Sequence, residues 1–241
     1  MQKQIAIIKS DLHGLRKALT NVATESLCVL TVDGESTCIF CSPNYFEELA
    51  VGYLAGRGII TAKEDIAMIA SDKHGVTINL KPQKGQAEAC AIGIIGKAPF
   101  DLEPEQVGKK LAAFNLDIAK IKAVMKEFIK PSLTYLQTRG VHSAAVGCGE
   151  KQLFWAEDVA RYNAFSKALG YCVLNELNMA DKYIMLSGRI SGDMVRQAKI
   201  VGVKLMVAKG TPLGQAIDLA RGFGIGIIGL VKGENCNIYN L

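Results

Sequence analysis

The last third of the chain alternates short apolar runs with amphipathic stretches. Residues 183–186, 203–208 and 225–231 are apolar runs of strand length. Residues 192–201 and 213–220, which separate them, place apolar side chains at helical spacing. Strands that alternate with helices of about ten residues are typical of βαβ units and a parallel sheet. This pattern predicts an α/β fold for the last third.

A turn with glycine and one basic residue follows each apolar run. The three turns are Ser187–Ser191, Lys209–Pro212 and Lys232–Asn235. The carboxyl ends of parallel strands form the ligand crevice of such a sheet, and helix N-termini there favour anions. We therefore expect Arg189, Lys209 and Lys232 to converge on a phosphate or pyrophosphate. The alternative is that these are ordinary solvated loop residues.

Capping residues predict where two helices of this region begin. Ser191 is expected to cap the helix after the first turn. Thr211 is expected to cap the next helix, with Pro212 at its first position.

The pattern before residue 180 predicts a mixture of strands and helices. Residues 1–24 suggest a short strand and an irregular segment, and residues 25–40 suggest a hairpin around Asp33-Gly34. Further strands are expected at residues 66–70, 76–80 and 152–155. One helix is expected to start at Ser42-Pro43. Other helices are expected at residues 103–114, 118–136 (bent at Pro131) and 157–175. The fold class is thus α/β, or α+β overall. We place a β-rich part with one helix and a mobile loop at residues 1–100, and an α/β domain at residues 101–241.

Composition limits the possible classes of protein. The chain has 241 residues, of which 49% are apolar and 21% charged, and its net charge is +5. No dense basic run with interleaved aromatic residues indicates a nucleic-acid partner. The sequence shows neither a signal peptide nor 18 uninterrupted apolar residues, so no membrane segment is expected. Seven cysteines, an odd number in mostly apolar surroundings, are typical of a reduced cytoplasmic protein.

Zinc or redox chemistry has weak support in the cysteine pattern. Cys38 and Cys41 form a C-x-x-C pair, but they lie in an expected strand, where residues three apart point to opposite faces. No second pair or nearby histidine completes a zinc site. We therefore expect no metal.

Several stretches together resemble the FdhD-type formate dehydrogenase accessory proteins, which are sulfurtransferases. The stretches are residues 42–54, 138–142, 157–164, 187–191 and 230–239. The resemblance extends from about residue 25 to residue 240. It implies a cytidine-deaminase-like, three-layer C-terminal core. The deaminase zinc chemistry itself is not expected, because Ala144 stands two residues after His142 where H-x-E is required, and P-C-x-x-C is missing.

The resemblance also implies partners and a ligand. It implies a homodimer that receives sulfur from a cysteine desulfurase and passes it to a molybdopterin guanine dinucleotide cofactor for formate dehydrogenase. A GDP-like nucleotide is the simpler ligand of the same kind. The diphosphate of either one agrees with the anionic crevice expected from the strand exits. The implied binding residues are Ser187, Gly188, Arg189, Lys209, Leu230, Val231, Lys232, Gly233, Glu234 and Asn235.

The chain departs from the family at the sulfur-carrying loop. Where the family has C-G-x-C-G-K, residues 92–97 read Ile-Gly-Ile-Ile-Gly-Lys, so Ile92 and Ile95 replace both cysteines. Cys90 is the candidate substitute nucleophile, because a persulfide needs a thiolate. Residues 91–99 are expected to form an exposed, poorly ordered loop or to pack on a partner subunit. Arg139, Ala160, Tyr162 and Asn235 also stand where the family usually has glycine, glycine, histidine and arginine.

His142 is the candidate general acid or base, because a histidine among small residues can titrate near neutral pH. A turn histidine that the backbone satisfies is the structural alternative. Two further functions remain open beside sulfur transfer. One is a non-catalytic, cofactor-binding paralogue, which the two isoleucines favour. The other is a nucleotide-binding domain with no link to molybdenum.

Overall fold

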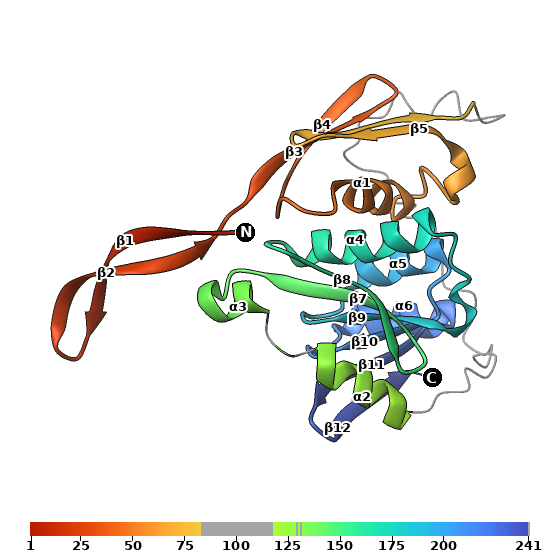
Figure 1. The fold of residues 1–241 in the computed structure, drawn as a ribbon. Helices are drawn as coiled ribbons and strands as arrows, with labels where there is room; N and C mark the ends of the chain where they lie inside the picture. The colour runs from red at the N-terminus through yellow and green to blue at the C-terminus, as the bar shows by residue number, and fades with distance from the viewer. Residues whose placement is uncertain (83–117, 129, 131, 241) are drawn as a thin grey trace.

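The computed structural model describes residues 1–82, 118–128, 130 and 132–240. These residues form a six-stranded sheet, a four-stranded sheet and a separate two-stranded hairpin (Figure 1). Three predictions from the sequence lie outside the described residues. They are the nucleophile Cys90, the loop at 91–99 with its two isoleucines, and the helix at 103–114.

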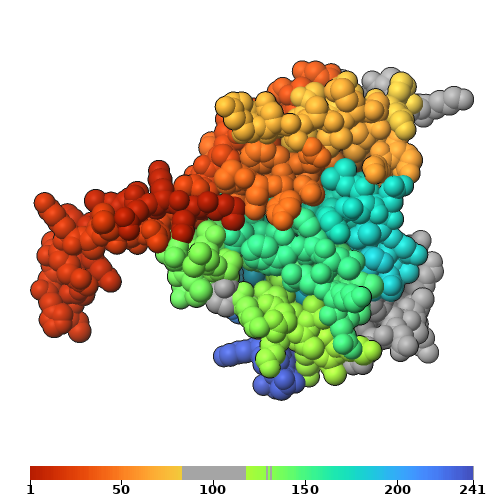
Figure 2. All heavy atoms as spheres, viewed as in Figure 1, coloured from red at the N-terminus to blue at the C-terminus, as the bar shows by residue number. Residues whose placement is uncertain are grey.

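The N-terminal hairpin projects from the body of the molecule (Figures 1 and 2). It consists of β1 (Gln2–Asp11) and β2 (Gly14–Ala23), which pair in antiparallel register along their whole length. The expectation of an irregular segment after a short strand is therefore wrong. The second strand has no alternating pattern of its own, and its conformation depends on hydrogen bonds to the first strand.

The four-stranded sheet has the order β4-β3-β6-β5. Its strands are β3 (Ser26–Val32), β4 (Glu35–Cys41), β5 (Ile66–Ser71) and β6 (Gly75–Leu80). Helix α1 (Phe46–Ala55) covers one face, and a short 3₁₀ helix, η1 (Lys63–Asp65), precedes β5. The predicted hairpin is confirmed, since β3 and β4 pair around Asp33 and Gly34, both with positive φ.

The six-stranded sheet has the order β12-β11-β10-β9-β7-β8. Its strands are β7 (His142–Cys148), β8 (Lys151–Asp158), β9 (Lys182–Leu186), β10 (Leu205–Ala208), β11 (Gly226–Lys232) and β12 (Asn235–Asn240). Strands β9, β10 and β11 are parallel, which confirms the predicted βαβ units. Strands β7 and β12 pair antiparallel at either side of these three. The sequence analysis missed β7, whose small residues carry little strand signal.

Helices cover both faces of the large sheet and make three layers. On one side lie α4 (Arg161–Leu174), α5 (Gly192–Val201) and α6 (Gly214–Phe223), which share a buried cluster with Ile184 and Met206. On the other side α2 (Ile118–Phe128) packs on Met185 and Val207. Neighbouring residues of a strand point to opposite faces of the sheet, so adjacent side chains pack against different helix layers. The three expected layers are present, while the likeness to cytidine deaminases stays a prediction.

Four expected helix boundaries are wrong. The helix expected to start at Ser42-Pro43 is α1, which begins at Phe46. The expected helix at 157–175 starts at Arg161, because residues 157 and 158 still pair with β7. The expected bent helix at 118–136 consists of two helices, α2 and α3 (Leu133–Thr138). Helix α6 has Leu213 rather than Thr211 as its N-cap, because residues 211–213 are hydrogen-bonded to Ile190 as an extension of the sheet. The predicted cap Ser191 is confirmed, since its side chain accepts a hydrogen bond from Met194 N.

The two parts of the chain meet through α1 and α4, which pack closely. A Cβ on Gly52 would lie 1.8 Å from Ser166 O, and one on Gly170 would lie 1.8 Å from Glu48 O. Only glycine allows the two helix backbones to approach this closely. The proposed division at residue 100 falls outside the described residues and stays a prediction. A second 3₁₀ helix, η2 (Met179–Asp181), leads into β9.

None of the helices in the described part of the chain is both long and apolar enough to span a membrane.

Candidate functional site

The exits of the three parallel strands lie side by side. Lys209 N donates to Leu186 O (2.9 Å), and Leu230 N donates to Gly210 O (2.9 Å). A Cβ on Gly210 would lie 2.4 Å from Gly188 O, so glycine is needed where the first two turns touch. The strand exits themselves are therefore adjacent, whereas the convergence of Arg189, Lys209 and Lys232 on one ligand stays a prediction.

The third exit leads into another strand, unlike the first two. Strand β11 continues to Lys232 and turns directly into β12, with Lys232 paired to Asn235. No helix N-terminus therefore comes after Lys232, unlike the first two turns. Val231 is buried against the layer of α2, and Gly233 supplies the positive φ of the turn. Glu234 is an exposed turn residue.

A cavity of about 460 Å³ opens beside the first two exits. Its volume falls within the range of about 300–1,000 Å³ that is usual for small-molecule sites. The lining residues are Phe128, Lys130, Ser132, Tyr135, Arg139, Val141, His142, Ser143, Ser187, Lys209 and Gly210. The cavity thus brings together three predicted residues, His142, Ser187 and Lys209, with Gly210 beside them. Of the other predicted cations, neither Arg189 nor Lys232 is among these lining residues.

Helix α3 forms a wall of the cavity that the sequence analysis did not identify. Ser132 caps this helix by accepting a hydrogen bond from Tyr135 N (3.0 Å). The Ser132 hydroxyl in turn donates to Glu157 Oε2 (2.5 Å), which ties the helix to the end of β8. The sequence does contain one signal for the start of this helix, namely Ser132, a capping residue directly after Pro131. The α3 wall supplies a hydroxyl, an aromatic ring and a guanidinium to the cavity.

Arg139 occupies a backbone conformation that normally favours glycine. Its φ is 55°, in the left-handed region, at the C-cap of α3. For a residue with a side chain this conformation costs about 1–2 kcal/mol. Arginine stands at this position although the resembled family usually has glycine there. The chain therefore tolerates local strain and gains a guanidinium at the cavity wall.

His142 and Arg161 approach the first strand exit from two different elements. A methyl group placed on Gly188 would lie 3.4 Å from His142 Nδ1 and 3.8 Å from Arg161 Cβ. Two hydrogen bonds next to this contact join Ser143 and Ser187, one from Ser143 N to Ser187 Oγ (2.8 Å) and one from Ser187 N to Ser143 O (3.0 Å). His142 therefore lies next to the 187–191 turn.

The surroundings of His142 favour its neutral form. Partial burial of the imidazole, followed by repulsion from the Arg161 guanidinium, lowers the pKa of His142. Arg161 Nε is itself buried and has no hydrogen-bond partner among the described residues. A negatively charged group bound here would satisfy that nitrogen and would raise the pKa of His142. The arrangement is therefore suited to an anion rather than to a cation.

The domain around the cavity carries an excess of positive charge. Residues 118–240 contain sixteen lysine and arginine residues against nine aspartate and glutamate residues. Lys130, Arg139 and Lys209 bring three of these cations to the cavity lining. Each comes from a different segment, so the positive potential is concentrated by the fold and not by a local basic run. In the described part of the chain, no group of three His, Cys, Asp or Glu side chains is arranged to hold a metal ion.

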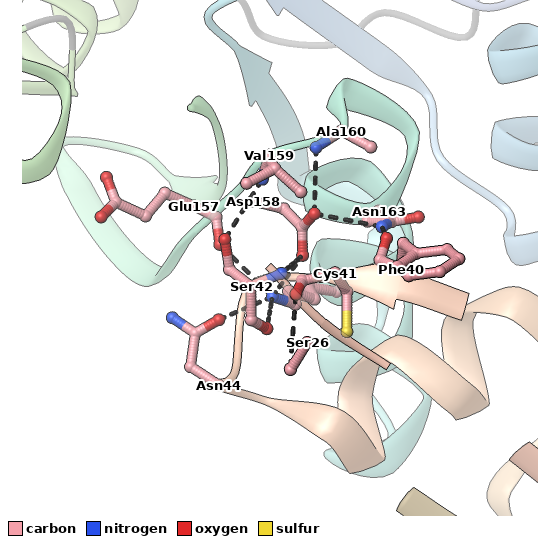
Figure 3. A network of polar contacts seen from close by, with 11 residues as sticks. Ser26, Phe40, Cys41, Ser42, Asn44, Glu157, Asp158, Val159, Ala160 and Asn163 are labelled. Atoms are coloured by element: carbon pink, nitrogen blue, oxygen red, sulfur yellow. Dashed lines mark hydrogen bonds and ion pairs between the residues drawn. The ribbon is translucent and has the colours of Figure 1, made fainter. Parts of the chain in front are cut away.

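A buried polar network holds the end of β8 in place behind the site (Figure 3). Lys167 Nζ lies 2.7 Å from Asp158 Oδ2, and both side chains are fully buried. The ammonium group also donates to Asn44 Oδ1 (2.6 Å), and Ser42 N donates to Asp158 Oδ2 (3.0 Å). Residues of the first part of the chain thus form hydrogen bonds with an ion pair of the second part. The network fixes the backbone of Glu157, and Glu157 in turn binds the cap of the α3 wall.

Three of the six described cysteines are poorly suited to carry sulfur as thiolates. Burial raises the pKa of Cys172 to about 12. The pKa of Cys148 is raised by burial and by Asp181, and that of Cys41 is raised by its hydrogen bond with Cys28 and by burial. Cys38 is exposed on the four-stranded sheet, away from the cavity lining. None of these four residues lines the site.

Comparisons with known proteins give a consistent result. Residues 23–241 match the model of the FdhD/NarQ family. A sulfur carrier protein FdhD of Bacillus licheniformis is 30% identical over 244 residues, which cover 97% of this chain and 93% of the relative. One of Bacillus subtilis is 29% identical over 223 residues, covering 88% and 85% respectively. A crystal structure of a putative formate dehydrogenase accessory protein from Desulfotalea psychrophila has the same fold, with a TM-score of 0.81 at 21% identity, and covers 100% of this chain and 97% of that one.

Proposed function

This chain belongs to the FdhD/NarQ family, and on that premise we propose that its cavity binds a molybdopterin guanine dinucleotide cofactor during formate dehydrogenase maturation. The observation that carries the proposal is the cavity at the carboxyl edge of the parallel sheet, with Lys130, Arg139 and Lys209 in its lining. A diphosphate is the part of the cofactor that three cations recognise through charge-assisted hydrogen bonds.

The other lining residues suit the remainder of a nucleotide. The Tyr135 ring offers an aromatic surface, and the hydroxyls of Ser132 and Ser187 offer hydrogen bonds to a sugar or phosphate. Gly210 also lines the cavity, and its missing side chain makes room for the backbone of Gly188. A GDP-like nucleotide fits the same recognition chemistry, so it serves as the simplest probe of the site.

Sulfur transfer is the second step of the proposed function. In this proposal a cysteine desulfurase supplies the sulfur, which Cys90 carries as a persulfide to the bound cofactor. The support is family membership, and Cys90 is the candidate carrier because isoleucine stands at positions 92 and 95. The rival is a non-catalytic cofactor- or nucleotide-binding paralogue, which the same two isoleucines favour. Cytoplasmic location and a homodimeric state belong to the same proposal.

Two measurements test the proposal. In the first, the protein is offered the molybdopterin guanine dinucleotide and plain GDP in competition. Preference for the dinucleotide supports the cofactor role, and equal affinity supports a generic nucleotide-binding domain. In the second, the protein is incubated with a cysteine desulfurase and cysteine and analysed by mass spectrometry. Sulfur on the wild type but not on Cys90→Ser supports transfer, and no sulfur on either one supports the non-catalytic paralogue.

A further inference from the structure

Helix α3, a wall of the cavity, packs mainly against the N-terminal hairpin. The helix has six residues, and none of its side chains is buried. A helix this short is not stable alone in water, because its first turn fixes several residues for one hydrogen bond. Among the described helices and strands, β2 is the one that α3 contacts most extensively, and Figure 1 shows α3 beside the base of the hairpin. The hairpin is therefore a main support of this wall.

Two residues at the root of the hairpin contact the chain on both sides of Arg139. Gln2 and Ala23 lie opposite each other in the register of β1 and β2. The Gln2 side-chain amide donates a hydrogen bond to Gln137 Oε1, two residues before Arg139. Ala23 Cβ lies 3.0 Å from where a Cβ on Gly140 would be, directly after Arg139. One cross-strand pair thus holds the end of α3 at two points.

The strained backbone of Arg139 needs contacts of this kind. A strained conformation persists only where the surrounding structure leaves the chain no relaxed alternative. Two hydrogen bonds at this turn are local, from Arg139 N to Tyr135 O (2.8 Å) and from Gly140 N to Thr138 Oγ1 (3.1 Å). Both would be lost together if the end of α3 unwound. The contacts with the hairpin root connect the same turn to a separate part of the fold.

We propose that the root of the N-terminal hairpin positions Arg139 in the wall of the cavity and thereby sets the affinity of the cavity for a diphosphate. This inference rests on the proposed function, because the diphosphate is the group that Arg139 meets there. Gln2 and Ala23 are positioning residues, since neither lines the cavity and both act through the end of α3. Without their contacts the turn relaxes, and the guanidinium leaves its place above the Tyr135 ring.

Hydrogen exchange tests the positioning role without a ligand. Gln2→Ala removes the hydrogen bond to α3, and Ala23→Leu pushes the root away from the turn. Gln4→Ala is the matched control, because Gln4 is an exposed glutamine of the same strand. The Arg139 amide should exchange about 2- to 13-fold faster in Gln2→Ala than in the wild type, the effect of one hydrogen bond on local opening. Ala23→Leu should exchange at least as fast as Gln2→Ala, and Gln4→Ala should match the wild type.

Calorimetric titration of GDP tests the link between the hairpin root and the cavity. Gln2→Ala should bind GDP at least about twofold more weakly than the wild type and Gln4→Ala, and at most about 13-fold more weakly. In an Arg139→Ala background, Gln2→Ala should have no further effect, because no guanidinium is left to position. A purely structural role of Gln2 would weaken binding equally in both backgrounds. If Ala23→Leu does not fold, Gln2→Ala decides both measurements.

Three results would overturn the inference. Equal exchange of the Arg139 amide in all four proteins would show that the hairpin root does not hold the turn. Unchanged GDP affinity in Gln2→Ala would show that the root does not act on the cavity. An equal loss of affinity in the Arg139→Ala background would show that it acts by another route. A wild type that binds no GDP would instead refute the proposed function and the link to affinity, while exchange of the Arg139 amide would still decide whether the root holds the turn.

Discussion

Arg139 folds back over Tyr135 at the end of helix α3. The Arg139 backbone N–H donates to Tyr135 O (2.8 Å), and its guanidinium carbon lies 5.0 Å from the centroid of the Tyr135 ring. Both side chains line the cavity. Arg139 thus has two roles. Its left-handed backbone ends helix α3, and its guanidinium brings a positive charge to the cavity.

Arg139→Gly should separate these two roles. Glycine removes the cost of the left-handed backbone, so the free energy of unfolding should rise by about 1 kcal/mol. The same change removes a cation from the cavity, so GDP should bind at least about tenfold more weakly. Arg139→Ala is the control, because it removes the cation but keeps the strained backbone. Urea unfolding and calorimetric titration measure the two effects, and weaker stability of the glycine variant would contradict the strain argument.

Gly210→Ala should disrupt the meeting of the strand exits. The added methyl would lie 2.4 Å from Gly188 O and 2.9 Å from Arg189 N, so the two turns would have to separate. We expect a destabilisation of about 1–3 kcal/mol, as for other overpacked positions, together with loss of nucleotide binding. Gly214→Ala is the matched control, because no atom lies within 4 Å of its added methyl. Equal melting temperatures of the two variants would disprove the close approach.

Lys167→Met should destabilise the protein strongly. It leaves Asp158 buried without its ion-pair partner, and breaking a buried pair costs about 3–5 kcal/mol. Lys130→Met breaks the exposed pair with Glu127 and should cost less than about 1 kcal/mol. Chemical denaturation of both variants gives the comparison. A Lys167→Met protein as stable as Lys130→Met would show that the network in Figure 3 contributes little to folding.

The pH dependence of stability should reveal the environment of His142. Its pKa is lowered in the folded state, so the unfolded state binds the proton more tightly. The contribution of His142 to stability is therefore present above about pH 6.5 and lost as the pH falls below that value. Between about pH 7.5 and about pH 5, the wild type should lose more unfolding free energy than His142→Gln. An identical loss in both proteins would show that folding does not lower the pKa of His142.

The sequence predicted the parallel part of the large sheet because its apolar runs have the length of strands, and the stretches between them place apolar residues at helical spacing. It also predicted that the turns of Ser187 and Lys209 lie at one edge of the sheet, since strand exits meet there. It predicted neither α3 as a separate helix nor the place of Arg139 in the cavity wall. Six residues are too few for a helical period, and a left-handed C-cap with arginine opposes ordinary propensity. Lys232 was grouped with the other two basic residues because its turn resembles theirs in sequence. The sequence does not reveal that this turn leads into the antiparallel strand β12 and not into a helix.

The buried ion pair and the N-terminal hairpin also escaped sequence reasoning. Asp158 and Lys167 read as the polar positions of a helix, whereas Asp158 ends a strand and Lys167 turns inward to meet it. Their pairing depends on Ser42, more than a hundred residues away along the chain. The hairpin depends on register between two strands, which pattern alone does not determine.

The account rests most directly on the claim that the cavity, and not the outer turn residues, binds the diphosphate. Calorimetric titration of GDP into the wild type, Lys209→Ala, Arg189→Ala and Lys232→Ala tests it. We predict that the wild type binds and that Lys209→Ala binds about 10- to 150-fold more weakly, the usual cost of one charge-assisted hydrogen bond. Arg189→Ala and Lys232→Ala should match the wild type, because neither residue lines the cavity. No binding by the wild type, or a loss in Arg189→Ala or Lys232→Ala with none in Lys209→Ala, would contradict the account.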